Sequence, residues 1–277
     1  MTLSDRNNIF KAGIAISSLC LLIVIAGSFR AIPVYRIMEP EVSRRSLTVF
    51  RLIIGKYLPI KLLAVHICIL ILVLYSFLSV ILIYYYFEKT QSPEILFIVL
   101  FAASFAPEAL RLILPLSRVY EIPSLYLLMS SRIILTGRYF GIFSLFTASL
   151  FAVGYRTQQQ STIIIIIVIA TLIIALGVPI DTQSWDSSLT MVNGYISMFR
   201  LIESGIFLIT TVTFFIAAWS RGSREFAFIG AGSVLVFLGR NILLSTDTWA
   251  GPPIGLAFLA AGTWLICTKL HKVYLWL

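Results

Sequence analysis

Long uninterrupted apolar runs are the feature of this sequence that most restricts its fold. In the clearest run, five consecutive isoleucines from Ile163 to Ile167 continue into VIATLIIALGV without a single charge. A transmembrane helix needs about 20 mainly apolar residues. Eight segments meet that requirement, with approximate bounds 10–29, 62–87, 94–114, 138–155, 162–180, 194–219, 226–244 and 253–270. The sequence therefore predicts an all-α polytopic transmembrane helix bundle of about eight spans, one N-terminal span followed by a seven-helix bundle.

The composition excludes the other broad classes of protein. Only 12% of the 277 residues are charged and 59% are hydrophobic, whereas a soluble domain has roughly 25% charged and about 45–50% apolar residues. So few charges cannot cover a water-soluble enzyme, and so much apolar surface excludes a disordered chain. The three cysteines each lie in an apolar run, which excludes a disulfide scaffold. We expect a single integral membrane domain over residues 1–277, located in the cell (cytoplasmic or inner) membrane.

Positive charge is concentrated in two stretches between apolar runs. Residues 30–61 and 111–138 together carry 11 of the 21 Lys and Arg residues, in a chain of net charge +9. The positive-inside rule predicts that both are amphipathic cytoplasmic segments, and anionic phospholipid head groups are the expected partners. The basic residues that we assign to head-group contact or to topology are Arg36, Arg44, Arg45, Arg118, Arg132 and Arg138. No nucleic-acid-binding motif occurs, so nucleic acid is not an expected partner.

The two basic stretches also resemble each other. Arg30, Pro33, Arg36 and Glu39 match Arg111, Pro115, Arg118 and Glu121, and GKY at 55–57 matches GRY at 137–139, always at an offset of 81 or 82 residues. A duplication would give two parallel repeat units, 10–87 and 94–155, and would leave 156–277 as a C-terminal four-span half. Chance resemblance between two basic segments is the alternative.

Two points of the topology have alternatives. The first span resembles a signal sequence but lacks a clear cleavage site, so we interpret it as retained, with a cleaved signal peptide as the alternative. Placing both basic stretches in the cytoplasm also puts Asp181 and Asp186 there and Arg221 and Arg224 outside. This distribution of charge in the second half of the chain is the reverse of what the positive-inside rule favours, so one segment between 111 and 193 is expected not to cross the membrane fully. The segment 122–131, which begins near a proline, is therefore a candidate for a re-entrant or interfacial helix.

Charged residues within spans are the candidates for a functional site, because they are costly in the bilayer. The third span contains Glu108 and Arg111, and the sixth contains Arg200 and Glu203; each pair has the i,i+3 spacing that places two side chains on one helix face. Arg240 in the seventh span can supply a further polar position. The alternative is that these arginines snorkel to the interface or form purely structural pairs.

His66 stands alone in an apolar run, LLAVHICILILVL, and a hydrogen bond between helices is its expected role, with a functional role as the alternative. No Cys/His cluster, catalytic motif or phosphate-binding loop occurs. We therefore expect no metal, no cofactor and no enzymatic activity, although a lipid-handling enzyme that uses loop residues is a third alternative.

These observations favour a small permease or a membrane-embedded transport subunit. Its polar site would lie between the two halves of the chain and bind an anionic or zwitterionic substrate through Glu108, Arg111, Arg200, Glu203 and Arg240. The alternative is a ligand-sensing or scaffolding seven-helix module that acts through a separate partner protein. In either case a partner membrane or cytoplasmic subunit is expected.

Overall fold

The protein is described here from a computed structural model, which describes residues 2–45, 62–88, 90, 92–155 and 159–275. The helices are α1 (Leu3–Arg45), α3 (Leu62–Phe87), α4 (Pro93–Ala103), the 3₁₀ helix η1 (Ala106–Leu112), α5 (Ile113–Tyr120), α6 (Ser124–Val153), α7 (Gln160–Gly177), α8 (Ile196–Ser220), α9 (Arg224–Ser245) and α10 (Gly251–Leu275). Two short strands, β1 (Ile180–Trp185) and β2 (Met191–Asn193), form an antiparallel hairpin between α7 and α8.

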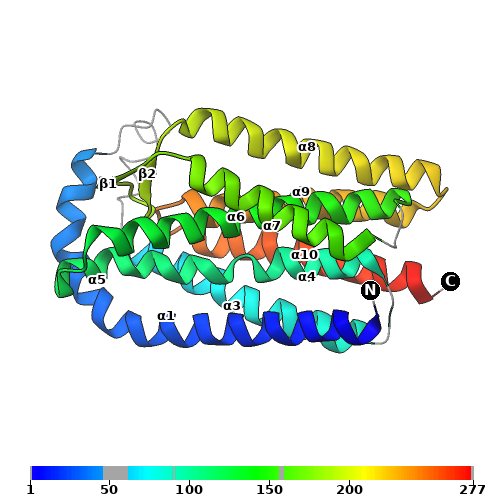
Figure 1. Cartoon of the computed structure of the whole chain (residues 1–277), viewed down its shortest axis with the longest axis horizontal. Coiled ribbons are helices and arrows are strands. Elements are labelled where there is room, and N and C mark those ends of the chain that lie inside the picture. Colours follow the sequence, from blue (N-terminus) through cyan, green and yellow to red (C-terminus); the bar gives the residue numbers. More distant parts are fainter. Residues whose placement is uncertain (1, 46–61, 89, 91, 156–158, 276–277) are drawn as a thin grey trace.

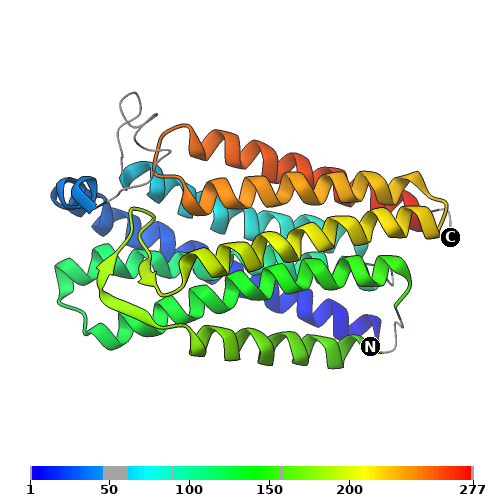
Figure 2. The ribbon, with the colours of Figure 1, turned by 90° about the horizontal axis from the view of Figure 1, so that it is seen from above.

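Eight helices of the described chain are long and apolar enough to cross a membrane, which confirms the predicted all-α bundle and agrees with the predicted number of candidate spans. The third of these spans is broken: α4, η1 and the first residues of α5 together make Pro93–Ser117. Successive spans run in opposite directions along the bundle, so that both termini lie at one end (Figure 1). We call this the terminal end. The opposite end holds the β1–β2 hairpin and the turn between α5 and α6, and we call it the hairpin end (Figures 1 and 2).

The two basic stretches are not loops where the structure describes them. Helix α1 continues as far as Arg45, and residues 46–61 lie outside the described part of the chain. The stretch 111–138 is almost entirely helical, with only 121–123 between α5 and α6. The candidate re-entrant or interfacial helix at 122–131 is not a separate element, because residues 124–131 form the first turns of the continuous 30-residue helix α6. Pro123 precedes that helix and does not break it, since a proline at a helix start costs no backbone hydrogen bond.

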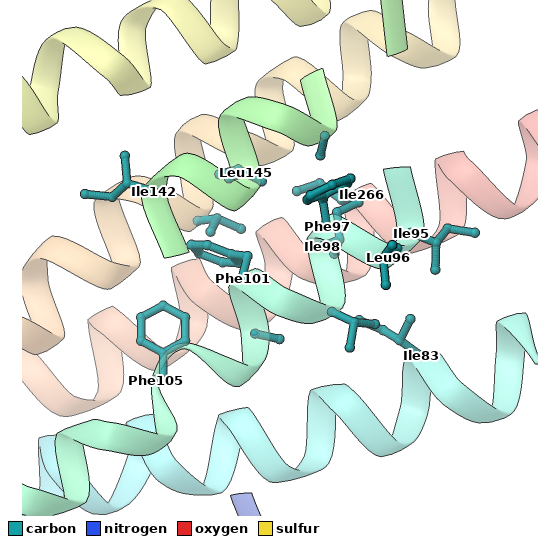
Figure 3. Close-up of a cluster of buried hydrophobic side chains, with 14 of the residues drawn as sticks. Ile83, Ile95, Leu96, Phe97, Ile98, Phe101, Phe105, Ile142, Leu145 and Ile266 are labelled. Atoms are coloured by element: carbon teal, nitrogen blue, oxygen red, sulfur yellow. The ribbon is translucent and has the colours of Figure 1, made fainter. Parts of the chain in front are cut away.

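The centre of the bundle is an apolar core in which α4 is surrounded by other spans. Phe97, Phe101 and Phe105 of the broken span face Ile142 and Leu145 of α6, with Ile83 of α3 and Ile266 of α10 beside them (Figure 3). The aromatic rings pack with preferred geometries: the centroids of Phe97 and Phe151 are 5.3 Å apart, and those of Phe101 and Phe105 are 5.1 Å apart, edge to face. Helix α7 contributes little to this core and lies at the edge of the bundle, beside α6 (Figure 2).

Glycines allow α9 and α10 to pack with their backbones nearly in contact. A Cβ atom added at Gly239 would lie 2.6 Å from the backbone nitrogen of Leu259 and 2.8 Å from the carbonyl oxygen of Gly255. One added at Gly262 would lie 2.7 Å from the carbonyl oxygen of Gly232. Close approach of this kind is a common source of stability between membrane helices, since neither helix gains from leaving lipid. Gly232, Gly255 and Gly262 thus allow α9 and α10 to approach each other closely.

We expect Gly239→Ala to destabilise the bundle by about 1–3 kcal/mol, because the added methyl group overlaps backbone atoms and forces the helices apart. Gly205 in α8 provides the control, since a Cβ atom there meets open space. Gly205→Ala should be neutral or slightly stabilising, as alanine is the better helix former. Thermal unfolding of both variants in the same detergent measures the difference. Equal melting temperatures for the two variants would contradict the close packing of α9 and α10.

Candidate functional site

The site begins at the break in the third span. Pro107 has no backbone N–H to continue a helix, and α4 gives way to η1 just before it. The 3₁₀ segment packs closely on α6 because α6 has glycines opposite it. A Cβ atom added at Gly137 would lie 3.0 Å from Cγ of Pro107 and 3.1 Å from the carbonyl oxygen of Ser104, and one at Gly141 would overlap the Ser104 side chain. This approach carries Glu108, in the middle of η1, against the charged face of α6.

Glu108 is the centre of a buried ion-pair network. Arg138 of α6 donates two hydrogen bonds to it, from Nε to Oε1 at 2.6 Å and from Nη2 to Oε2 at 2.9 Å. Arg111, one turn along η1, donates from Nη1 to Oε2 at 3.3 Å. Two parallel bonds from one guanidinium are the strongest geometry available to a carboxylate. Glu108 is 1% exposed, so the network lies within the protein and not at its surface.

Arg111 links this network to the hairpin. Its Nη2 donates to the backbone carbonyl of Ser188, which lies between β1 and β2. Its Nε is buried and makes no hydrogen bond in the described structure. The neighbouring apolar residues of the hairpin, Trp185, Leu189 and Met191, are buried in a second core cluster with residues of α1, α3 and η1. The hairpin therefore packs against the helices at this end of the bundle.

Arg240 of α9 enters the same region from the C-terminal half of the chain. Its Nη1 lies 3.7 Å from Oε2 of Glu203 in α8, and its Nη2 lies 3.4 Å from the backbone carbonyl of Arg138. A further contact of 3.4 Å joins Nη1 to Oδ1 of Asn241. The guanidinium also lies over the ring of Phe207, 5.8 Å from its centroid. Arg240 is only 1% exposed, so its guanidinium is closed off from the surface.

We call these five side chains, Glu108, Arg111, Arg138, Glu203 and Arg240, the arginine–glutamate cluster. It contains three cations and two carboxylates, and so carries one unbalanced positive charge. A buried charge without a counterion costs several kcal/mol. The side chains of Arg138 and Glu203 keep 17% and 21% of their surface exposed, whereas Arg111 and Arg240 are closed off. An anion that entered past Arg138 and Glu203 would meet the excess positive charge inside.

The structure brings together four of the six predicted candidates for substrate binding or ion pairing, namely Glu108, Arg111, Glu203 and Arg240. Arg200 lies apart from these four: its side chain is exposed, and within the described chain it forms no ion pair with Glu203 despite the i,i+3 spacing. Arg138 was assigned by sequence to head-group contact or topology, and the structure places its guanidinium against Glu108 instead of among the exposed basic residues. It lies near the middle of α6, because 124–153 is one continuous helix. A reading of 122–153 as a single span would have placed Arg138 among the intramembrane charges.

The other predicted basic residues do not belong to the arginine–glutamate cluster, or their side chains lie outside the described residues. Arg132 donates from Nη1 to the carbonyl oxygens of Ala175 and Leu176, both at 2.6 Å, and so caps the end of α7. The side chains of Arg36, Arg44, Arg45 and Arg118 lie outside the described residues. Their assignment to head groups or topology stays a prediction.

His66, the sixth candidate, joins α3 to α1. Its Nε2 lies 2.9 Å from Oγ of Ser28, and its Nδ1 lies 2.8 Å from Oη of Tyr35. Ser28 already donates its only proton to the carbonyl of Val24 at 2.6 Å, so it accepts from Nε2–H and Tyr35 donates to Nδ1. Both ring nitrogens are thereby satisfied in the neutral form. This geometry fits the expected helix-joining hydrogen bonds.

Comparisons with known proteins gave no match: no protein-family model, no curated protein and no solved structure is similar to this chain. Within the described residues, no group of three or more His, Cys, Asp or Glu side chains is placed to hold a metal ion. The arginine–glutamate cluster is thus the strongest candidate functional site in the described structure.

Proposed function

We propose that this protein is a small permease or membrane-embedded transport subunit of the cell membrane, with the arginine–glutamate cluster as its site for an anionic or zwitterionic substrate. The observation that carries the proposal is the unbalanced positive charge of a cluster buried among spans. Intramembrane charges are retained mainly where they serve a substrate or ion pathway, because they are costly to insert.

The position of the cluster between the two halves of the chain supports the same proposal. Glu108, Arg111 and Arg138 belong to the spans before residue 156, and Glu203 and Arg240 belong to the spans after it. The two groups touch through the 3.4 Å contact from Arg240 to the Arg138 carbonyl. Alternating access requires a site between two parts that can move against each other. Separating two groups joined by a long polar contact costs less free energy than separating two groups joined by a tight ion pair.

A flux measurement tests the proposal. Vesicles containing the protein are diluted into concentrated potassium chloride, acetate or phosphate, with a potassium ionophore present, or into glycine, and swelling is followed by light scattering. We expect swelling faster than that of protein-free vesicles with at least one of these solutes. Arg240→Gln should reduce that rate about tenfold or more, because loss of a hydrogen bond to a charged group costs about 1.5–3 kcal/mol.

Arg200→Gln is the matched control for the flux measurement, because Arg200 is an exposed arginine outside the cluster. It should swell at the wild-type rate. Vesicles with folded wild-type protein that swell no faster than empty ones in any of the four solutes would contradict transport.

The link from Arg111 to the hairpin favours a second candidate function, a ligand-sensing or scaffolding module. A ligand that competes for Arg111 would weaken its bond to the Ser188 carbonyl and so change how the hairpin is held. A partner protein that docks on this end of the bundle could respond to that change. Binding of a ligand at the cluster without any flux would favour this candidate over the permease.

A further inference from the structure

The arginine–glutamate cluster has a tight half and a loose half. Glu108 and Arg138 form two hydrogen bonds of 2.6 and 2.9 Å, which lie within or at the short edge of the usual range for a charged pair. The polar contacts of Arg240 with the described residues are longer: 3.4 Å to the Arg138 carbonyl, 3.4 Å to Asn241 and 3.7 Å to Glu203. The usual N–H···O distance is about 2.7–3.2 Å. Arg240 is therefore a buried guanidinium that makes no hydrogen bond of normal length with the described residues.

The surroundings of Arg240 differ from one side to the other. Its Cζ atom lies 5.8 Å from the centroid of the Phe207 ring, and Phe207 packs against Phe237 with 4.1 Å between the ring centroids and 33° between the ring planes. A cation over an aromatic ring is attracted to it without use of its N–H groups. The side of the cluster at Glu203 and Arg138 retains exposed surface. A ligand would approach Arg240 from that side, where Oε2 of Glu203 lies 3.7 Å from Nη1 of Arg240.

We propose that Arg240 is the binding site for a compact monovalent anion, either a carboxylate group or a small inorganic ion, and that Glu203 is its internal competitor. When the anion binds, it replaces the 3.7 Å contact to Glu203 with hydrogen bonds to the guanidinium. One negative charge balances the one excess positive charge of the cluster, whereas a polyanion would exceed it. The inference deepens the proposed function and rests on the same cluster, but binding does not require transport.

The binding test uses the full-length protein in discs of zwitterionic lipid, in the potassium salt of a bulky organic sulfonate. Acetate or chloride then replaces the sulfonate at constant ionic strength, and the melting temperature is recorded. Ligands that bind only the folded state raise that temperature. We expect a rise of about 5–10 °C for wild type at an anion concentration near 100 times the dissociation constant.

Two variants with opposite expected effects separate a binding role from a structural one. Glu203→Gln removes the competitor, so the half-saturating anion concentration should fall about two- to fivefold, because an ion pair that retains exposed surface is worth at most about 1 kcal/mol. Arg240→Gln should abolish the rise. Arg200→Gln, on the same helix as Glu203 but exposed, should respond as wild type does. If Arg240→Gln fails to fold, the tighter binding by Glu203→Gln still decides the matter.

The inference is overturned if acetate and chloride both fail to raise the melting temperature of wild type and of Glu203→Gln. It is also overturned if the melting temperature of Arg240→Gln rises as much as that of wild type. Discs that contain phosphatidylglycerol distinguish the source of the anion: a lipid head group at Arg240 would raise the melting temperature of wild type but not of Arg240→Gln, and would weaken the response to acetate. Binding without flux would refute the transport proposal alone, and flux in vesicles without anion-dependent stabilisation would refute this inference alone.

Discussion

Glu108→Gln is expected to destabilise the folded protein by about 3–5 kcal/mol, the typical cost of removing one partner from a buried ion pair. Glu108 accepts three hydrogen bonds from Arg111 and Arg138. A neutral amide would leave both arginines buried without their carboxylate and would add a second unbalanced positive charge. The loss should appear as a large fall in melting temperature and in the yield of monodisperse protein.

Two comparisons isolate the ion pair as the cause. Glu121→Gln changes an exposed carboxylate in the turn between α5 and α6, and should leave the melting temperature unchanged. The double variant Glu108→Gln with Arg138→Gln restores the wild-type net charge of the cluster, so it should be more stable than the sum of the single changes predicts. Additive effects, or a melting temperature of Glu108→Gln close to wild type, would show that Glu108 does not hold the cluster together.

Arg6→Gln should destabilise the terminal end of the bundle by about 2–4 kcal/mol, since hydrogen bonds from a charged donor are each worth about 1.5–3 kcal/mol. Arg6 is 5% exposed and donates from Nη2 to the carbonyl oxygens of Phe87 at 2.9 Å and Glu88 at 2.7 Å, and from Nη1 to that of Thr90. Phe87 is the last residue of α3, and Glu88 and Thr90 follow it, so these carbonyls lie where the helix no longer supplies N–H donors. Arg6 therefore fastens α1 to the end of α3.

Hydrogen exchange provides the local measurement for Arg6. Amide protons in the last turns of α3 should exchange faster in Arg6→Gln, whereas those near the hairpin should not change. Lys11→Gln is the control, because Lys11 is an exposed cation on the same helix. Equal exchange in the two variants would show that the carbonyls at the end of α3 do not depend on Arg6.

How much could be predicted differs between the fold and the site. The spans are predictable one at a time, because a segment such as 163–178 must satisfy its own backbone within lipid and has only the helix to do so. The boundaries were predicted less well, because α6 begins at Ser124 and not near 138. Charged residues such as Arg132 and Arg138 interrupt the apolar run, so the sequence did not indicate one continuous helix there. The candidate repeat of 10–87 and 94–155 stays a prediction, since residues 55–57 lie outside the described chain.

The members of the site could be predicted in part. Glu108, Arg111, Glu203 and Arg240 stand out because charges inside apolar runs are rare. Their partners do not follow from spacing along the chain. Arg200 and Glu203 share a spacing of three residues, but α8 turns Arg200 to the exterior, while Glu203 faces Arg240 of α9. Likewise the carboxylate of Glu108 is held most tightly by Arg138, which is 30 residues away.

By itself, the sequence determined that this chain forms apolar helices and that several of them contain charged residues, since both follow from the local balance of apolar and ionised side chains. Tertiary structure alone decided which charges meet. Pro107 breaks the third span, Gly137 and Gly141 let the broken segment approach α6, and the α8–α9 contact brings Glu203 to Arg240. Each of these is a distance between segments far apart in the chain, and side-chain periodicity within one helix carries no information about it.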